Sequence, residues 1–274
     1  MSSASSPSSS SPSSSAAAPP SDVVARLRAA GCVFAEDEAR LLVSAARTPD
    51  ELAAMVGRRA GGLPLEHVLG WAEFHGLRVA VDPGVFVPRR RTEFLVDRAA
   101  ALAPPRAVVV DLCCGTGALG AALAAALDGA ELYAADIDPA AVRCARRNVP
   151  AGARVYEGDL YAPLPAALRG RVDILLANVP YVPTEEVGLL PPEARIHEAR
   201  GALDGGADGL DVLRRVTAEA PGWLAPGGSL LVETSERQAA GAAETFAANG
   251  LVPRVCSSDE LYATVVIGTV AYSG

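Results

Sequence analysis

From about residue 93 onward, short apolar segments alternate with segments of helical pattern, and this alternation leaves few folds open to the chain. It is typical of an α/β protein whose mostly parallel sheet carries helices on both faces. The pattern predicts strands at 107–112, 131–136, 153–157, 172–178, 229–233, 251–256 and 263–270, and helices at about 93–102, 118–127, 139–148, 208–220 and 236–249.

The residues before this region predict a separate helical module. Residues 22–62 mix polar and apolar positions at helical spacing, with one helix expected at about 35–46. Thr48-Pro49-Asp50-Glu51 has the N-cap, proline and glutamate of a helix start. Residues 69–81 predict a linking hairpin. We therefore expect a disordered Ser/Pro/Ala tail over 1–21, a helical docking domain over 22–75, and the rest of the hairpin with the α/β domain over 76–274.

Composition excludes several chemistries. All 24 basic residues are Arg, so the chain has no Lys for a Schiff base, pyridoxal phosphate or a Walker-A loop. The five Cys and three His lack metal-binding spacing, so no metal is expected. A net charge of −8 does not favour sequence-specific nucleic-acid binding. No run approaches the roughly 18 apolar residues of a membrane span. We expect a soluble, cytoplasmic protein that contacts no membrane.

A glycine-rich turn follows the first strand of the α/β region. Gly115, Gly117 and Gly120 match the G-x-G-x-x-G pattern of dinucleotide sites, and Asp136 ends the next strand. An NAD-dependent oxidoreductase is therefore one alternative. Against it, Asp111 would place a negative charge beside a pyrophosphate, whereas an ammonium or sulfonium group would be attracted to that carboxylate.

S-adenosylmethionine (SAM) meets the demands of these acidic strand ends. Its ammonium can approach Asp111, and its ribose hydroxyls can donate to Asp136. Asp159, after the third strand, can accept from the adenine amino group. Each carboxylate alone could be a solvated turn residue, but the three in this order indicate a cationic adenosyl cofactor.

Asn178-Val179-Pro180-Tyr181, the N-V-P-Y motif, follows the apolar strand predicted at 172–178. Open α/β sheets bind ligands at the carboxyl ends of their strands. An amide oxygen and a backbone carbonyl there could accept both hydrogens of a planar NH2 group, while the tyrosine ring stacks on it. The alternative is a proline turn in which Tyr181 only packs.

These segments together resemble the motif series of class I SAM-dependent methyltransferases that act on an NH2 nitrogen. Three further stretches resemble the protein-(glutamine) N(5)-methyltransferases that modify translation release factors. These are the segment F-V-P-R-R-R-T-E at 86–93, the segment A-L-D-G-G-A-D-G-L at 202–210, and residues 224–233. The match runs from about residue 64 to 268, and a helical module precedes it as in that family.

The resemblance implies a Rossmann-like, doubly wound fold and methyl transfer from SAM to a glutamine side-chain nitrogen. Asn178 Oδ1 and the Val179 carbonyl would accept the two N–H groups, Pro180 would stiffen the turn and Tyr181 would pack on the substrate. A release factor or another translation protein would be the partner, and the chain would be monomeric. Cofactor contacts are implied for Asp111, Cys113, Gly115, Thr116, Gly117, Asp136, Asp159, Leu160 and Asn178.

The chain departs from the family pattern mainly on the substrate side. Val179 replaces the first proline of N-P-P-Y, Arg90 and Arg91 replace a Pro-Glu pair, and Ala199 replaces a proline after Glu198. Cys113 and Cys114 stand where small loop residues are usual. Two alternatives outside this family stay open: an adenine-N6 or other nucleobase methyltransferase, and a non-catalytic scaffold of the same fold.

Overall fold

The computed structural model of the protein describes residues 20–271. The tail predicted over 1–21 lies outside these residues, except for its last two positions. The chain forms two compact units, which divide between Gly61 and Gly62. Within residues 20–271, no helix is long and apolar enough to cross a membrane.

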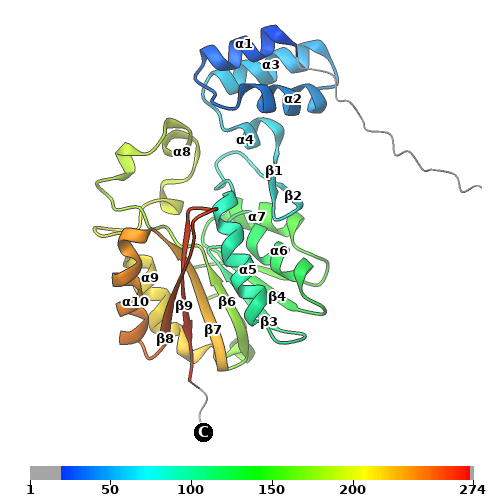
Figure 1. Ribbon diagram of the computed structural model, residues 1–274. Coiled ribbons are helices and arrows are strands. Elements are labelled where there is room, and N and C mark those ends of the chain that lie inside the picture. The colour runs from blue at the N-terminus through cyan, green and yellow to red at the C-terminus, as the bar shows by residue number, and fades with distance from the viewer. Residues whose placement is uncertain (1–19, 272–274) are drawn as a thin grey trace, which may run out of the picture. The chain divides into compact units, whose positions relative to one another are not determined.

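The first unit contains helices α1 (Ser21–Ala29), α2 (Ala35–Ala45) and α3 (Pro49–Ala60), drawn in blue in Figure 1. The predicted start of α3 is confirmed, because Thr48 Oγ1 accepts a hydrogen bond of 3.1 Å from the Glu51 N–H. Leu27 and Leu42 are fully buried among these helices. The guanidinium of Arg59 donates to both oxygens of Glu38 at 2.6 and 3.0 Å, so this buried ion pair links α2 to α3.

A seven-stranded sheet forms the centre of the second unit, and this confirms the predicted mostly parallel α/β fold. Strands β5, β4, β3, β6 and β7 run parallel, while β9 is antiparallel to both β7 and β8. In sheet order, the strands are β5 (Arg154–Glu157), β4 (Glu131–Asp136), β3 (Val108–Leu112), β6 (Val172–Ala177), β7 (Leu224–Thr234), β9 (Ala263–Thr269) and β8 (Val252–Ser258).

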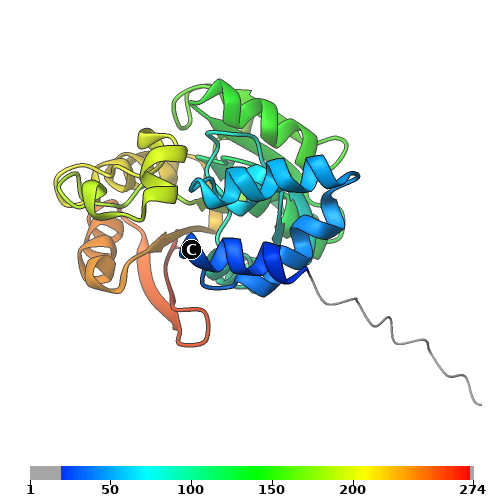
Figure 2. The same cartoon turned by 90° about the horizontal axis from the view of Figure 1, so that it is seen from above.

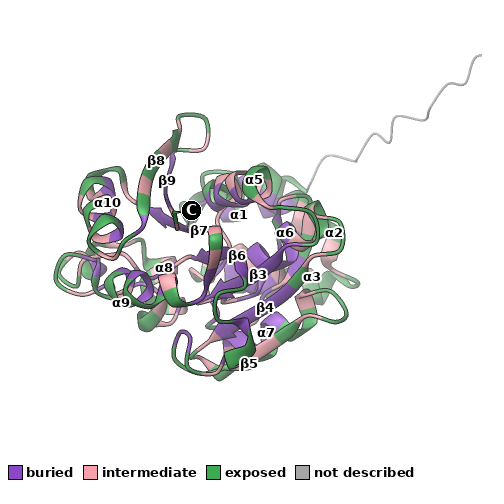
Figure 3. Ribbon diagram, turned by 90° about the horizontal axis from the view of Figure 1, so that it is seen from below, coloured by how far each residue is buried: buried purple, intermediate pink, exposed green. Residues whose placement is uncertain are grey.

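Helices cover both faces of this sheet, and the alternation of side chains along each strand supplies both cores. In β6, Ile174 and Leu176 face α5 (Glu93–Leu102) and α6 (Ala118–Ala126), and α7 (Pro139–Asn148) lies on the same face. Leu175 and Ala177 face α9 (Asp211–Glu219) and α10 (Ala239–Ala248). Buried residues accordingly follow the strands and the inner helix surfaces in Figure 3.

The linking hairpin belongs to the second unit. It follows α4 (Leu65–Leu69) and pairs β1 (Trp71–Phe74) with β2 (Leu77–Ala80). The sequence places the domain division after residue 75, in the middle of this hairpin. The structure places it earlier, because Phe74 is fully buried in the core with residues of α5 and the Ala80 amide donates to Asn148 at 2.8 Å.

The long connection from β6 to β7 contains α8 (Pro192–His197) and then α9. The sequence predicts the second of these helices at about 208–220, but it predicts no element between residues 178 and 208. Figures 1 and 2 show this connection on the side of the sheet that carries α9 and α10, near the carboxyl ends of the parallel strands. It therefore forms a wall over the edge where the predicted site residues gather.

Candidate active site

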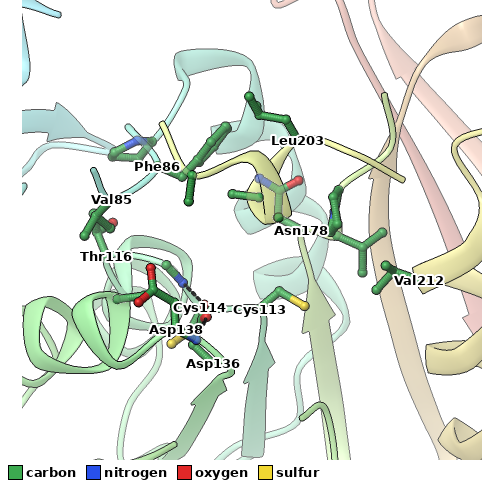
Figure 4. A pocket seen from close by; sticks show the side chains of 18 of the residues that line it. Val85, Phe86, Cys113, Cys114, Thr116, Asp136, Asp138, Asn178, Leu203 and Val212 are labelled. Carbon is green, nitrogen blue, oxygen red and sulfur yellow. Dashed lines mark hydrogen bonds between the residues drawn. The ribbon is translucent and has the colours of Figure 1, made fainter. Parts of the chain in front are cut away.

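A cavity of about 780 Å³ lies at the carboxyl ends of β3, β4 and β6. That volume is within the roughly 300–1,000 Å³ range of small-molecule sites. Its walls come from the glycine loop after β3, the ends of β4 and β6, the segment before α5, and the β6–β7 connection. Figure 4 shows Asp136 at the end of β4 and Asn178 at the end of β6, with Cys113 and Cys114 between them.

Most of the predicted site residues line this cavity together: Cys113, Gly115, Thr116, Asp136, Asp159, Leu160, Asn178, Val179, Pro180 and Tyr181. The two exceptions are Asp111 and Gly117. Asp111 is only 1% exposed at the end of β3, and Gly117 begins α6 beside Ala145 of α7.

Asp111 supports the glycine loop from behind. Its Oδ2 atom accepts a hydrogen bond of 2.9 Å from the Gly120 amide. Burial raises the pKa of Asp111 to about 7, with a contribution from the negative charge of Asp136, although the Gly120 bond opposes the shift. This buried carboxyl, close behind the cavity wall, is therefore only partly ionised at neutral pH.

Asp136 is held by the backbone at both oxygens. Oδ2 accepts from the Gly115 amide at 2.8 Å and Oδ1 from the Asp138 amide at 2.9 Å. Burial raises the pKa of Asp136. The next turn is also fixed, because Asp138 caps α7 by accepting from the Ala140 amide at 2.8 Å. The orientation of Asp136 toward the cavity therefore depends on the loop it contacts.

Asp159 differs from the free acceptor that the sequence suggested. Its Oδ2 atom accepts from Arg215 on α9 at 2.6 Å, and both side chains are about half exposed. Next to it, Leu160 is buried and lies in the left-handed backbone region with φ of 47°. The acidic group remains on the cavity wall, but an arginine shares its charge.

The two acceptors of the N-V-P-Y motif are unpaired. Among the described residues, neither the Asn178 carboxamide nor the Val179 carbonyl has a hydrogen-bond partner. Both residues line the cavity, and Val179 itself is 2% exposed. Two oxygen acceptors are thus available at this wall for a ligand with two N–H groups.

The glycines of the segment at 202–210 permit a close approach to this motif. The Gly205 amide donates to the Val182 carbonyl at 2.8 Å. A Cβ atom on Gly205 would lie 2.6 Å from the Pro180 oxygen, and one on Gly209 would lie 2.2 Å from the Tyr181 oxygen. Side chains at these two positions would displace the motif, which explains the glycine pattern in physical terms.

The tyrosine of the motif is fixed at its hydroxyl. Tyr181 Oη accepts from Arg91 Nη2 at 2.7 Å and donates to Glu233 Oε1 at 3.0 Å, and Arg91 Nε donates to the same carboxylate oxygen at 2.9 Å. Burial and the negative charge of Glu233 raise the pKa of Tyr181 to about 12. The hydroxyl is therefore protonated at neutral pH, and its proton is donated to Glu233 Oε1.

Sequence reasoning missed several supporting residues. The Glu198 side chain is fully buried and accepts from Arg89 Nη2 at 2.6 Å and from the Val87 amide at 3.1 Å. Gln238 donates to the Tyr181 carbonyl at 2.9 Å. These partners lie far apart in the sequence, so the only available signal was that the segments containing them resemble one family.

The thiols beside the cavity are neutral. Burial raises the pKa of both Cys113 and Cys114, and the carboxylates of Asp111 and Asp136 raise it further. Within residues 20–271, no group of three or more His, Cys, Asp or Glu side chains could hold a metal ion.

Comparison with known proteins identifies close relatives. Residues 76–208 match the family model of the methyltransferase small domain. The chain is 44% identical to a release factor glutamine methyltransferase of Geobacter sulfurreducens over 70% of this chain and 68% of that one. It is 40% identical to one of Mycolicibacterium smegmatis over 82% of both chains. In fold it is similar to a methyltransferase crystal structure from Pyrococcus furiosus, with a TM-score of 0.54, 16% identity, and coverage of 72% of this chain and 90% of that one.

Proposed function

Because the chain belongs to the family of release factor glutamine methyltransferases, we propose that it transfers a methyl group from SAM to the side-chain amide nitrogen of a glutamine in a peptide chain release factor. The observation that carries this proposal is the pair of unpaired acceptors, Asn178 Oδ1 and the Val179 carbonyl, on the cavity wall. A primary amide presents two N–H donors, so it can satisfy both oxygens at once.

The cavity residues suit SAM chemically. The acidic side chains of Asp111, behind the glycine loop, and of Asp136 and Asp159, on the cavity wall, favour a cationic ligand. Asp136 would accept from the ribose hydroxyls, and the 69% exposed side chain of Ile137 offers apolar surface to a planar base. When bound, SAM supplies an electrophilic methyl group on a sulfonium sulfur.

The chain's own residues would orient the nucleophile. An amide nitrogen is a poor nucleophile because its lone pair is delocalised into the carbonyl. Asn178 and Val179 would hold both N–H groups and so turn the nitrogen lone pair toward the methyl group. Positioning of this kind can supply several kcal/mol of the barrier reduction, about 7–11 in well-oriented intramolecular reactions.

The substrate side of the proposal extends to the helical unit. We assign α1, α2 and α3 to docking of the protein substrate, which agrees with the docking role expected of residues 22–75. Docking of the protein substrate on this unit would let binding energy from contacts outside the reacting amide place the glutamine at Asn178. The expected cytoplasmic location and monomeric state stay predictions.

The test is a methylation assay with the purified chain, SAM and a peptide chain release factor. Tandem mass spectrometry should find one added methyl group on a glutamine side-chain amide. A release factor whose mapped glutamine is replaced by asparagine is the matched control and should remain unmodified. Methylation of adenine in a DNA duplex without methylation of the release factor would support the nucleobase alternative. Tight NAD binding without SAM binding would contradict the proposal altogether.

A further inference from the structure

Arg91 departs from the family pattern, and its side chain contacts the N-V-P-Y motif directly. The resembling family segment has a Pro-Glu pair where this chain has Arg90 and Arg91. Here the Arg91 guanidinium donates to Glu233 at 2.9 Å and to the Tyr181 hydroxyl at 2.7 Å. Three chain segments therefore meet at one hydroxyl: the turn before α5, the loop after β6, and the end of β7.

Among these three residues, Glu233 is the deeply buried partner and Arg91 is the partly exposed one. The Glu233 side chain is 2% exposed, whereas the Arg91 side chain is 43% exposed and lines the cavity together with Tyr181. Glu233 Oε1 receives both hydrogen bonds, and its Oε2 atom is buried without a hydrogen-bond partner in the described part of the chain. The rigid strand end therefore anchors the arginine, and the arginine holds the tyrosine.

The neighbouring arginines provide an internal comparison. Arg89 fastens the same segment to Glu198 in the β6–β7 connection at 2.6 Å. The side chain of Arg90 is exposed and makes no hydrogen bond or ion pair with any described residue. Of the three, Arg91 is therefore the arginine that bonds to the motif.

We propose that Arg91 is a positioning residue, which fixes the Tyr181 ring against the cavity through the hydroxyl bond and the ion pair with Glu233, and thereby sets how the glutamine side chain is held. This inference rests on the proposed methyl transfer. The two hydrogen bonds at Oη hold the far end of the ring, while Gln238 and Gly209 hold its backbone. Without Arg91, the ring keeps its backbone position but loses a constraint on its orientation.

The kinetic test compares Arg91→Met with Arg90→Met. We expect Arg91→Met to lower kcat/KM for the release factor by about 10- to 100-fold, the scale of a displaced positioning group. SAM affinity should stay within about threefold, and Arg90→Met should match the wild type. Tyr181→Phe should lower kcat/KM by a similar factor. The double variant with Arg91→Met and Tyr181→Phe should be no less active than the less active single variant, because both substitutions remove the same interaction. Equal behaviour of the two arginine variants, or losses that multiply in the double variant, would overturn the proposal.

A second variant separates positioning from charge balance. Arg91→Met leaves Glu233 buried without its ion-pair partner, which can disturb folding. Arg91→Met combined with Glu233→Gln removes both charges. If Arg91 positions Tyr181, the kcat/KM of this double variant should stay below that of the wild type. A return to wild-type kcat/KM would mean that Arg91 only neutralises Glu233.

An NMR measurement without substrate tests this inference independently of the proposed function. In 13C-tyrosine NMR spectra, the Tyr181 ring signal, assigned with Tyr181→Phe, should shift and broaden in Arg91→Met and stay unchanged in Arg90→Met. An unchanged signal in Arg91→Met contradicts the positioning role. A wild-type chain that leaves the release factor unmethylated contradicts the proposed function instead, while the NMR result still decides whether Arg91 holds the ring.

Discussion

Replacement of Gly205 by alanine tests how closely the motif is held. The added Cβ would lie 2.6 Å from the Pro180 oxygen and 2.7 Å from the Gly209 oxygen, and both are backbone atoms that no side-chain rotation can move away. The first distance must widen by about 0.8 Å to reach ordinary contact at 3.4 Å. Pro180 follows Asn178 by two residues, so much of this displacement should reach the two acceptors.

We expect two consequences of Gly205→Ala. Overpacking should cost about 1–3 kcal/mol of unfolding free energy. Displacement of the acceptors by a large fraction of an ångström should lower turnover by up to about 100-fold. Single-turnover methylation at saturating SAM measures the second effect, and thermal unfolding measures the first.

Gly188→Ala is the matched control, because a Cβ at Gly188 meets no atom within 4 Å. SAM affinity, measured by calorimetry, should be little changed in both variants. If a folded Gly205→Ala protein turns over as fast as Gly188→Ala, the close approach does not position the acceptors and the reasoning is wrong.

Three more predictions concern the cofactor loop and the motif. Asp136→Ala should weaken SAM binding in calorimetry by about 1–3 kcal/mol, the loss expected for charge-assisted hydrogen bonds, and equal affinity would exclude a ribose contact. Because burial raises the pKa of Asp111 to about 7, this carboxyl is partly protonated at neutral pH, and a nearby cation favours its ionised form. SAM binding should then release protons, and SAM affinity should increase as the pH rises toward about 7. Calorimetry in two buffers of different ionisation enthalpy measures the proton release, and Asp111→Asn should abolish that release. Val179→Pro should keep methylation within about threefold of the wild type, since the Val179 amide donates no hydrogen bond within residues 20–271 and the carbonyl acceptor stays in place; a large loss would show that the substitution moves the carbonyl.

Much of the fold is predictable because local patterns agree with it. The strand predicted at 172–178 is observed at Val172–Ala177, and the predicted Thr48 cap is present. The start of β7 is an exception. It begins at Leu224 rather than 229, because the strand keeps its pairing with β6 through an irregularity between Val172 and Ile174. Because Pro-Gly-Gly at 226–228 is typical of a turn, the sequence does not predict that pairing.

Features that depend on exposed or distant residues are not predictable in this way. Helix α8 has no buried residue, so it shows no apolar periodicity. The same distinction between local patterns and distant residues applies to the site. Asp136 and Asn178 could be placed together, because the carboxyl ends of parallel strands meet at one edge. Arg91 and Glu233 lie 142 residues apart, and no local pattern joins them.

The central claim is that Asn178 orients the attacking amide nitrogen, and Asn178→Ala tests it most directly. The measurement is single-turnover methylation of a release factor, with SAM affinity determined on the same protein. We expect turnover to fall by about 100-fold or more, the scale of a lost preorganised polar contact, while SAM affinity changes by less than about threefold. Near wild-type methylation by Asn178→Ala would mean that the N-V-P-Y motif is only a turn and that other residues position the substrate.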